Sequence, residues 1–432
     1  MRKIVLTTGG TLGDLHPFIA IALALRSRGF APVLAVPEDQ VEKCVQAGLG
    51  AVRVRPGFDA IAGRMGLSHD AAVRQIMGNQ RIMLEQVLPG LSANVTALEA
   101  VAADGEAMVA SVFVFASPIV AEKHDMPMIS VILQPMAMRS AYDPPHTPEF
   151  WMMRGAPVGT AGARWNRFAY AALHLVLDHL YGKRIDRVRM AQGLSPTGAR
   201  GLLGAPDRAL LQLGCCSPQL APLPRDASRA TRIVGFPQFD RADGDSHALD
   251  PAIATFLAAG PPPLVFTVGT FAVDGAGAFY ERAAAAARAL RMRAILLVGG
   301  VAPPRLDGDM LRCGYAPHSQ LFPHAAAIIH HGGVGTAGQA MRAGKPQLGV
   351  PHMGDQHDHA ARLVRLGVGL RVAPRRFTVR RDTRQIAVLL RQPSFRANAS
   401  RLAQAMRDEQ GAVAAAAAIA GVPNASRSKS QE

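Results

Sequence analysis

Apolar and polar positions follow two alternating patterns along this chain. Short apolar runs, such as 3–8 and 264–268, are typical of strands that are buried on both faces of a parallel sheet. Between them lie longer stretches, such as 278–290, in which apolar residues recur at helical spacing. This succession of strand and helix predicts an α/β fold built from doubly wound sheets.

The elements fall into two sets on either side of a proline-rich stretch at 261–263. The first set has predicted strands at 3–8, 32–36, 51–54, 107–113, 127–133, 208–213 and 231–235, with helices starting at Pro17 and spanning 38–47 and 79–103. The second set has strands at 264–268, 293–298, 311–315 and 325–329, with helices at 278–290, 379–392 and 395–420.

Two Rossmann-like domains are therefore predicted, at 1–240 and 264–421, with a linker at 241–263. An open alternative for the last helix is that it packs back on the first domain. The polar tail 422–432 is predicted to be disordered.

The stretch from 142 to 193 contains both tryptophans and predicts one long helix. Trp165, Phe168 and Leu175 fall on one face, and a basic end follows at 183–189. The face is either an ordinary core-packing face with a solvated end, or an apolar acceptor mouth whose basic rim rests on a membrane.

The most informative motif follows the strand at 325–329. His330 and His331 end that strand, and three glycines come within the next four positions before a helix begins. Strand, glycine turn and helix leave backbone N–H groups free at a helix N-terminus, which suits a phosphate. The hydroxyl of Thr336 and a histidine at the strand end can add hydrogen bonds.

A related turn, 9–14, follows the first strand. Its glycine spacing is not GxGxxG, but Glu38 and Asp39 follow the second strand, where dinucleotide enzymes carry an acidic residue. The spacing alone therefore leaves a dinucleotide enzyme open.

Composition narrows the class of protein. The chain has 432 residues, of which 49% are hydrophobic and 18% charged, which suits two folded domains. Its net charge of +15 fits a soluble surface, or attraction to anionic nucleotides or to an acidic membrane face. Aromatic residues make up only 5%, and no nucleic-acid module is present, so nucleic acid is not an expected partner.

The four cysteines, Cys44, Cys215, Cys216 and Cys313, have no metal-ligand spacing and favour a reducing compartment. No signal peptide precedes the first strand, and the apolar run at 412–420 is too short to cross a bilayer. We therefore expect a cytoplasmic protein, with peripheral contact at the inner membrane face left open.

The run from His330 to Leu363, HHGGVGTAGQAMRAGKPQLGVPHMGDQHDHAARL, closely resembles the nucleotide-sugar signature of family 1 glycosyltransferases, which have the two-domain GT-B fold. RIVGFPQFD and PPPLVFTVGT strengthen a likeness to bacterial glycolipid rhamnosyltransferases and, next, to sterol and glycopeptide glucosyltransferases. The resemblance extends from the N-terminus to about residue 395. It implies two domains that face each other across a cleft, with the acceptor on the first and the donor on the second.

The resemblance also implies roles for individual residues. The donor diphosphate would contact Thr270, His331, Gly333, Gly335 and Thr336; the nucleoside Tyr315, His318 and Gln339; and the sugar Asp355 and Gln356. Gln339 stands where plant relatives have glutamate, which leaves UDP and dTDP both open. His330 is either a packed residue or a ligand.

Asp14 matches the family's general base, and burial would have to raise its pKa for that work. The alternative is that Asp14 caps the helix that follows it. In plant relatives a histidine is the base and a second aspartate orients it. Here the matching position is Ser111, so no such pair is expected.

A metal site is not expected. His352, His357 and His359 have spacings that do not place them on one helical face, and no cysteine or carboxylate set completes a site. The resemblance implies a metal-independent enzyme without a cofactor other than its nucleotide-sugar co-substrate.

These observations predict an inverting glycosyltransferase that uses a UDP- or dTDP-sugar. The acceptor would be a hydroxyl of a hydrophobic molecule, such as a lipid, a sterol, a polyketide or another natural product. The alternatives are a nucleotide-sugar epimerase on the same fold and a non-catalytic, glycosyltransferase-like activator.

Overall fold

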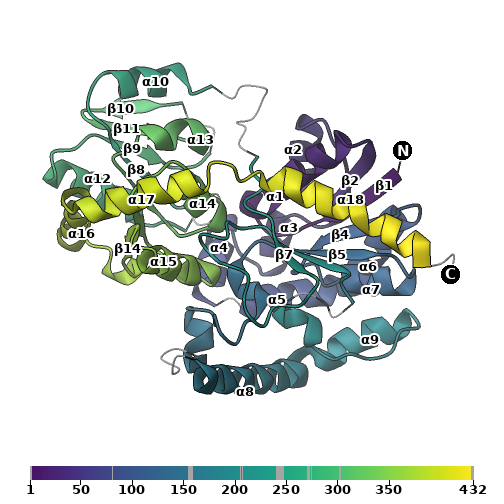
Figure 1. Cartoon of the computed structure of the whole chain (residues 1–432). Coiled ribbons are helices and arrows are strands. Elements are labelled where there is room, and N and C mark those ends of the chain that lie inside the picture. Colours follow the sequence, from purple (N-terminus) through teal and green to yellow (C-terminus); the bar gives the residue numbers. More distant parts are fainter. Residues whose placement is uncertain are drawn as a thin grey trace.

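A computed structural model of the chain describes residues 2–79, 81–153, 159–204, 206, 208–239, 248–269, 273, 275–300 and 303–429. The two halves of the chain each fold around one seven-stranded sheet with helices on both faces (Figure 1). The predicted α/β architecture of two doubly wound, Rossmann-like domains is therefore confirmed.

The first sheet is entirely parallel, and its strand order is β3-β2-β1-β4-β5-β6-β7. Its strands are β1 (Arg2–Thr7), β2 (Phe30–Pro37), β3 (Gly50–Arg55), β4 (Ala107–Ser111), β5 (Met128–Ile132), β6 (Leu211–Gly214) and β7 (Thr231–Ile233). Successive side chains point to opposite faces: Ile4 and Leu6 share a core with α1, whereas Val5 shares one with α6. Cores on both faces explain the uninterrupted apolar runs.

The second sheet has the order β10-β11-β9-β8-β12-β13-β14. Its strands are β8 (Leu264–Thr267), β9 (Ala294–Leu297), β10 (Arg305–Asp307), β11 (Met310–Cys313), β12 (Ala327–His330), β13 (Gln347–Gly349) and β14 (Gly369–Arg371). Only the edge strand β10 is antiparallel to its neighbour. Phe266 packs toward α12 and α16, and Val265 packs toward α10 and α13.

Helices cover both faces of each sheet. Those of the first half are α1 (Leu12–Arg26), α2 (Val41–Gln46), α3 (Phe58–Arg64), α4 (His69–Gly78), α5 (Arg81–Val87), α6 (Leu91–Ala102), α7 (Ser117–Lys123), α8 (Thr160–Leu177) and α9 (Lys183–Ala191). Those of the second half are α10 (Pro251–Ala258), α12 (Phe279–Ala289), α13 (His318–Leu321), α14 (Val334–Arg342), α15 (Asp355–Arg365), α16 (Val379–Arg391), α17 (Pro393–Ala405) and α18 (Gly411–Lys429). Among the helices described here, none is both long and apolar enough to cross a bilayer.

The first helix starts earlier than predicted. Helix α1 begins at Leu12, so Pro17 lies inside it and does not open it. Thr11 is the N-cap, and its backbone N–H and hydroxyl form a reciprocal capping box with Asp14. This box fixes the first turn, and the apolar residues that follow then join the core.

The predicted linker at 241–263 contains a helix in its second half. Asp250 is the N-cap of α10 and accepts a hydrogen bond from the N–H of Ala252 at 2.8 Å, with Pro251 in the first turn. Ile253 and Phe256 of α10 are buried against the second sheet. The Asp-Pro pair is a helix-start signal that the sequence analysis overlooked.

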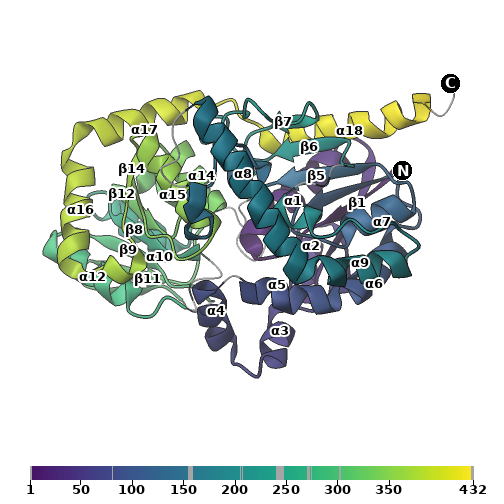
Figure 2. The ribbon, with the colours of Figure 1, turned by 90° about the horizontal axis from the view of Figure 1, so that it is seen from below.

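Helix α8 exposes the apolar face that the sequence analysis assigned either to core packing or to an acceptor mouth. Trp165, Phe168 and Leu175 are 44%, 59% and 71% exposed, and α8 runs along the outside of the first domain (Figure 2). Its buried face is made instead of small or polar residues, which include Gly162 and Ala163. Small residues let the helix approach the body of the domain closely. Because the apolar residues of α8 are exposed, the core-packing interpretation of the apolar face is wrong.

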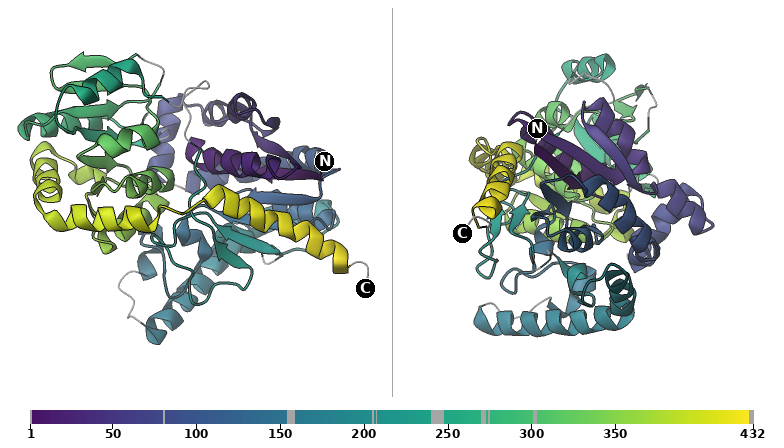
Figure 3. Two further views of the ribbon diagram at one scale, coloured as in Figure 1. Left: turned by 45° about the horizontal axis from the view of Figure 1, so that its top comes forward. Right: turned by 90° about the vertical axis from the view of Figure 1, so that its right-hand side faces the viewer.

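The C-terminal segment crosses between the two halves of the molecule. The helix predicted at 395–420 is interrupted: α17 ends at Ala405 in the second half, and α18 begins at Gly411. Helix α18 lies along α1 of the first domain (Figure 3), and its Ala415 and Ile419 join the core of the first sheet. The backbone of α18 continues past residue 421 to Lys429, and residues 430–432 of the predicted tail lie outside the described residues.

Candidate active site

A pocket of about 270 Å³ lies between the two halves of the chain, where residues that follow the strands of both sheets face each other. Its walls include nearly every residue that the sequence analysis selected: Asp14, Tyr315, His318, His331, Gly333, Gly335, Thr336, Gln339, Asp355 and Gln356. Thr270 lies outside the described residues, but the preceding Gly269 lines the pocket. The fold thus gathers residues from distant parts of the sequence into one cleft.

Asp14 belongs to the capping box of α1 and also lines the cleft. Its Oδ2 accepts a hydrogen bond from the backbone N–H of Thr11 at 2.9 Å, and its Oδ1 accepts one from the side-chain amide of Gln134 at 3.2 Å. The N-cap is therefore Thr11, which corrects the capping alternative for Asp14. The carboxylate is held from two sides while it lines the pocket.

The surroundings of Asp14 bring its pKa close to neutral pH. Burial raises the pKa from 3.8 to about 6, the charge of Asp355 on the opposite wall adds to the rise, and the hydrogen bonds from Thr11 and Gln134 oppose it. Such a carboxylate is still mostly ionised at pH 7, yet it holds a proton far better than a free aspartate does.

His331 occupies a slot between two glycines. A Cβ atom at Gly269 or at Gly333 would collide with the His331 imidazole, so a side chain at either position would displace that ring. Gly332, which turns the chain after His331, has a φ of 90°, a conformation that also favours glycine. Burial, followed by the nearby His330, holds the pKa of His331 well below its usual range, so the imidazole is neutral at pH 7. Its buried Nδ1 has no hydrogen-bond partner within the described part of the chain.

Helix α14 starts directly at the cleft. Gly333 is its N-cap and offers no side chain to satisfy the first N–H groups of the helix. Gly335 and Thr336 of the first turn line the pocket. Free N–H groups and a helix dipole at this point form a seat for an anion, as the glycine motif predicts.

His330 is a packed residue and supports this turn from behind. It is fully buried, its Nε2 lies 2.9 Å from the side-chain oxygen of Gln347, and its Nδ1 accepts a hydrogen bond from the N–H of Gly332 at 3.1 Å. His359 is also buried, and its Nδ1 donates to the carbonyl oxygen of Gly332 at 2.9 Å. Over the described ranges, no cluster of three or more His, Cys, Asp or Glu side chains is arranged to hold a metal ion.

Aromatic rings form one wall of the cleft. Tyr315 is 37% exposed, and its ring lies 6.3 Å from that of His318 at an angle of 28°. His318 in turn stacks on Phe322, with ring centres 4.3 Å apart. This row of flat rings offers a surface on which a nucleobase can stack.

Asp355 and Gln356 begin helix α15. The side-chain oxygen of Gln356 accepts hydrogen bonds from the N–H groups of His352 at 2.8 Å and Met353 at 3.2 Å. Only the amide NH₂ of Gln356 therefore remains to donate to a ligand. Burial is the main cause that raises the pKa of Asp355.

Gln134 and Phe236 are site residues that the sequence analysis missed. Gln134 follows β5 at the same edge of the sheet at which Asp14 follows β1, so the rule that ligands bind at the carboxyl ends of strands could have found it. Phe236 follows β7 and lines the cleft, and a Cβ at Gly338 of α14 would meet its ring. Nothing in the sequence pattern relates Phe236 to Gly338, because the contact joins the two domains.

A buried ion-pair network ties α15 to the first domain. The Arg362 guanidinium donates to Asp358 and to Asp143, each at 2.7 Å, and Arg362 is only 1% exposed. Asp358 also accepts a hydrogen bond from the backbone N–H of His146 at 3.0 Å. Because Asp143 and His146 belong to the first domain, the helix that begins with Asp355 is anchored across the cleft. We call Asp143, Asp358 and Arg362 the interdomain latch.

Comparison with known proteins identifies families and relatives whose sequences resemble this one. Residues 4–142 match the family described as glycosyltransferase family 28 N-terminal domain, and residues 305–420 match erythromycin biosynthesis protein CIII-like, C-terminal domain. The chain is 30% identical over 437 residues to O-mycaminosyltylonolide 6-deoxyallosyltransferase of Streptomyces fradiae, covering 95% of this chain and 94% of that protein. It is 31% identical over 377 residues to vancomycin aglycone glucosyltransferase of Amycolatopsis orientalis, covering 85% of each.

Solved structures agree on the fold. The crystal structure of glycosyltransferase VinC in complex with dTDP matches with a TM-score of 0.69 at 18% identity, covering 98% of this chain and 100% of that chain. Two facing Rossmann-like domains with a cleft at their carboxyl edges define the GT-B class. Together with the relatives, this shows that the protein belongs to the GT-B glycosyltransferases of the natural-product type and is an enzyme.

Proposed function

We propose that the protein is an inverting glycosyltransferase that moves a sugar from a UDP- or dTDP-sugar to a hydroxyl of a hydrophobic acceptor. The observation that carries this proposal is that Asp14 and the anion seat of α14 line the same cleft from opposite domains. A base on one side and a seat for a leaving diphosphate on the other are what one displacement step needs.

On the donor side, the free N–H groups at Gly333 and Gly335, the Thr336 hydroxyl and the His331 imidazole would hold the diphosphate. As the bond between the anomeric carbon and the phosphate oxygen breaks, its electron pair passes to the diphosphate, and these fixed donors stabilise the new charge. We propose that they do so without a metal ion. The structures of VinC and of other relatives hold thymidine diphosphate, which supports a nucleoside diphosphate at this seat.

On the acceptor side, the hydroxyl oxygen attacks the anomeric carbon while Asp14 takes its proton. A single displacement of this kind inverts the configuration of the anomeric carbon. Gln134 and Thr11 would keep the carboxylate aimed during the transfer.

The acceptor is proposed to lie in a neighbouring pocket of about 610 Å³ in the first domain, which shares Thr11 and Leu12 with the cleft. Apolar side chains that include Phe58 and Met83 line it, together with a few polar groups such as Arg55. This lining suits a hydrophobic alcohol with a small number of polar substituents. The S. fradiae and A. orientalis relatives are named for a tylonolide and a vancomycin aglycone, which supports a natural-product acceptor. A lipid acceptor and a rhamnosyl donor remain proposals based on the sequence resemblance.

The exposed face of α8 supports a second, peripheral role. Phe168 and Leu175 are uncovered, and the cations Arg164, Arg167 and Lys183 lie exposed on and just beyond the same helix. Apolar and basic side chains together suit the interface of an anionic membrane. We propose contact with the cytoplasmic face of a membrane. The four buried, free cysteines are compatible with that reducing compartment.

One experiment tests the proposed reaction. The enzyme is incubated with labelled UDP- and dTDP-sugars, with and without a panel of hydroxylated lipids, polyketides and flavonoids, and the anomeric configuration of the product is read from NMR couplings. Inverted product that forms only with an acceptor is expected. Retained configuration would refute the single displacement, and an altered sugar without acceptor would indicate an epimerase. Sedimentation with anionic vesicles at low salt, with Leu175→Ser as the comparison, tests the membrane contact separately.

A further inference from the structure

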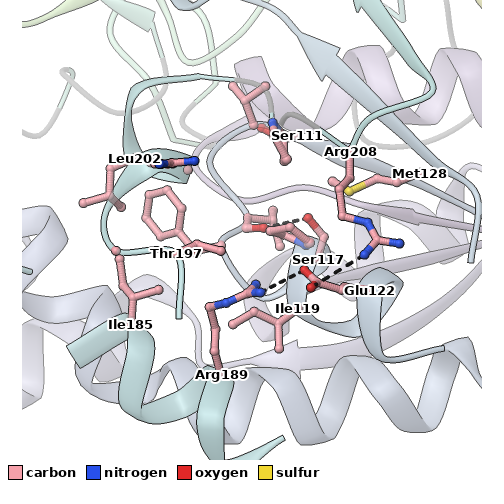
Figure 4. Close-up of a pocket in the computed structure, with 18 of the residues that line it drawn as sticks. Ser111, Ser117, Ile119, Glu122, Met128, Ile185, Arg189, Thr197, Leu202 and Arg208 are labelled. Carbon is pink, nitrogen blue, oxygen red and sulfur yellow. Dashed lines mark hydrogen bonds and ion pairs between the residues drawn. The ribbon is translucent and has the colours of Figure 1, made fainter. Parts of the chain in front are cut away.

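A second large cavity lies within the first domain. Its volume is about 590 Å³, and it is bounded by α7, α9 and the segment that contains Thr197 and Leu202 (Figure 4). Among the described residues, none lines both this cavity and the cleft between the domains. The reaction proposed above makes no use of it.

The interior of this cavity is mostly apolar. Its apolar lining side chains include Val112, Val114, Phe115, Ile119, Met128, Ile185 and Leu202. A cavity of this size with such a lining is typical of sites that enclose a drug-sized organic molecule.

Cations outnumber anions along the walls. Figure 4 shows Arg189 and Arg208 converging on Glu122, at 2.9 and 3.6 Å. Arg189, which is only 4% exposed, also donates to the carbonyl oxygen of Ser195 at 2.7 Å, so its guanidinium is committed to the protein. Glu122 is the only acidic side chain among the described lining residues, and two arginines already compensate it.

Of the two other arginines that line the cavity, Arg200 is exposed, and the cation in the interior is Arg139. It is half-buried, and it makes no ion pair with any residue that the structure describes. Its positive charge opposes the rise that burial causes in the pKa of Tyr170 on α8. One helical turn further, His174 lines the same cavity, and its buried Nε2 has no hydrogen-bond partner among the described residues. A ligand carboxylate in the cavity would give the half-buried Arg139 a counter-charge and would offer an acceptor to the buried Nε2 of His174.

We propose that this cavity is a second ligand site, which binds an apolar molecule carrying a single carboxylate. The carboxylate accepts hydrogen bonds from Arg139 and from Nε2–H of His174, and the apolar body fills the space lined by Phe115, Ile119 and Leu202. Arg139 selects the anion, because its charge-assisted bonds have no acceptor in the described protein.

The first test measures charge selectivity in the full-length protein by fluorescence titration. The probes are 11-(dansylamino)undecanoate and its methyl ester, which differ in charge but share the apolar body. The carboxylate should bind and be displaced by decanoate, and Arg139→Gln should weaken its binding by roughly tenfold without changing that of the ester. Arg288→Gln, on the surface of the second domain, is the matched control. Saturating UDP should not displace the probe. Equal binding of ester and carboxylate, or displacement by UDP, would overturn the proposal.

A second variant keeps the proposal testable if the loss of Arg139 disturbs the fold. A Cβ at Gly201, which lines the cavity, would meet no atom within 4 Å, so Gly201→Phe can fill the space from the wall. It should abolish binding of both probes, whereas Gly421→Phe, at an equally open glycine on α18, should not. Unchanged binding in Gly201→Phe at a normal melting temperature would refute the site.

Binding of the carboxylate as a monomer identifies a free amphiphile as the ligand. Binding only to vesicles that contain the probe would identify a lipid headgroup and contradict an enclosed site.

Discussion

At the scale of single residues, burial sets the chemistry of both walls of the cleft. It lowers the pKa of His331 on the wall of the second domain, the proposed donor wall, and raises the pKa of Asp14 on the wall of the first domain, the proposed acceptor wall, to about 6. At pH 7 the imidazole is then neutral and can form hydrogen bonds. The carboxylate is mostly ionised, but it accepts a proton more readily than a free aspartate does. Two different residue types are thereby adapted to opposite tasks by the same dry environment.

His331→Ala tests the donor wall. The variant should lose roughly 2–4 kcal/mol of transition-state stabilisation, measured as a fall in kcat/KM, because one fixed donor to the leaving diphosphate is missing. Its binding of the nucleotide-sugar should weaken as well, by calorimetry. EDTA should leave wild-type turnover unchanged. A loss of activity in EDTA that a divalent ion restores would contradict the metal-free mechanism.

Asp14→Asn tests the acceptor wall. Asparagine keeps the size of the side chain and can still accept the Thr11 hydrogen bond, but it cannot take a proton, so turnover should fall by about 10²–10⁴-fold. Donor binding should survive. In the wild type, kcat/KM should rise with pH and level off above about 6, where Asp14 is ionised. If activity persists and only the melting temperature falls, Asp14 serves only in the capping box of Thr11 and is not the base.

The same substitution has a second readout in stability. The folded-state pKa of Asp14 lies above its unfolded value of 3.8. Between pH 3.8 and about pH 6, the folded protein therefore binds a proton that the unfolded chain has lost. The stabilisation from this proton is complete below 3.8 and is lost as the pH rises through 6. Asp14→Asn does not titrate. Its melting temperature relative to the wild type should therefore increase across this interval, and a constant difference would show that the pKa is not raised.

At the scale of elements, α15 contributes both to the proposed donor site and to the contact between the domains. It begins with Asp355 and Gln356 in the cleft, and one to two turns later it carries Asp358 and Arg362 of the interdomain latch. A rigid helix passes any displacement of the latch on to the residues proposed to bind the sugar. The latch is therefore expected to influence donor affinity without touching the donor.

Asp143→Asn tests this coupling. It leaves Arg362 with Asp358 as its remaining carboxylate partner in the latch, so the free energy of unfolding should fall by roughly 1–3 kcal/mol, and the KM for the donor should rise. The control is Asp307→Asn, which breaks the exposed pair with Arg288 in the second domain and should cost about 0.5 kcal/mol or less. An unchanged donor KM in Asp143→Asn would show that the latch only adds stability.

The elements also show what the sequence could and could not predict. The glycine turn after β12 could be located because a buried strand, three glycines and a helix make a local signal that needs no partner. The orientation of α8 could not be predicted, because periodicity tells which residues share a face but not which face meets the protein. Gln356 could be selected for the site by its motif, but its bonds to His352 and Met353 could not be predicted, because they form only in the folded turn.

At the scale of the whole molecule, the chain passes between the domains twice. The segment that follows β7 contacts the segment between α17 and α18. Glu409, between α17 and α18, accepts a hydrogen bond from the Ser217 hydroxyl at 2.6 Å, and its carbonyl oxygen accepts one from Arg342 at 3.0 Å. Gly411 packs against the backbone of Gly235 and Phe236 so closely that a Cβ there would collide with it. Such long-range contacts leave no trace in local sequence patterns, which explains why the sequence left the partner of the last helix open.

Truncation tests the role of α18. Removal of residues 411–432 should uncover apolar side chains of α1 that include Leu15 and Phe18, and should cause aggregation or a large loss of melting temperature. Removal of 423–432 alone keeps Ala415 and Ile419 and should leave the melting temperature nearly unchanged. Equal melting temperatures for the full chain and for the chain that ends at residue 410 would show that α18 is dispensable.

The double crossing has a consequence for recombination between relatives. Because α18 completes the core of the first domain, the second domain is an insertion in the first domain rather than its C-terminal neighbour. A functional chimera that exchanges donor specificity should therefore need two junctions, one near residue 240 and one between Ala405 and Gly411, so that α1 and α18 come from the same parent. A single-junction chimera would pair these helices from different parents, and the mismatch would lie in a buried core far from any substrate.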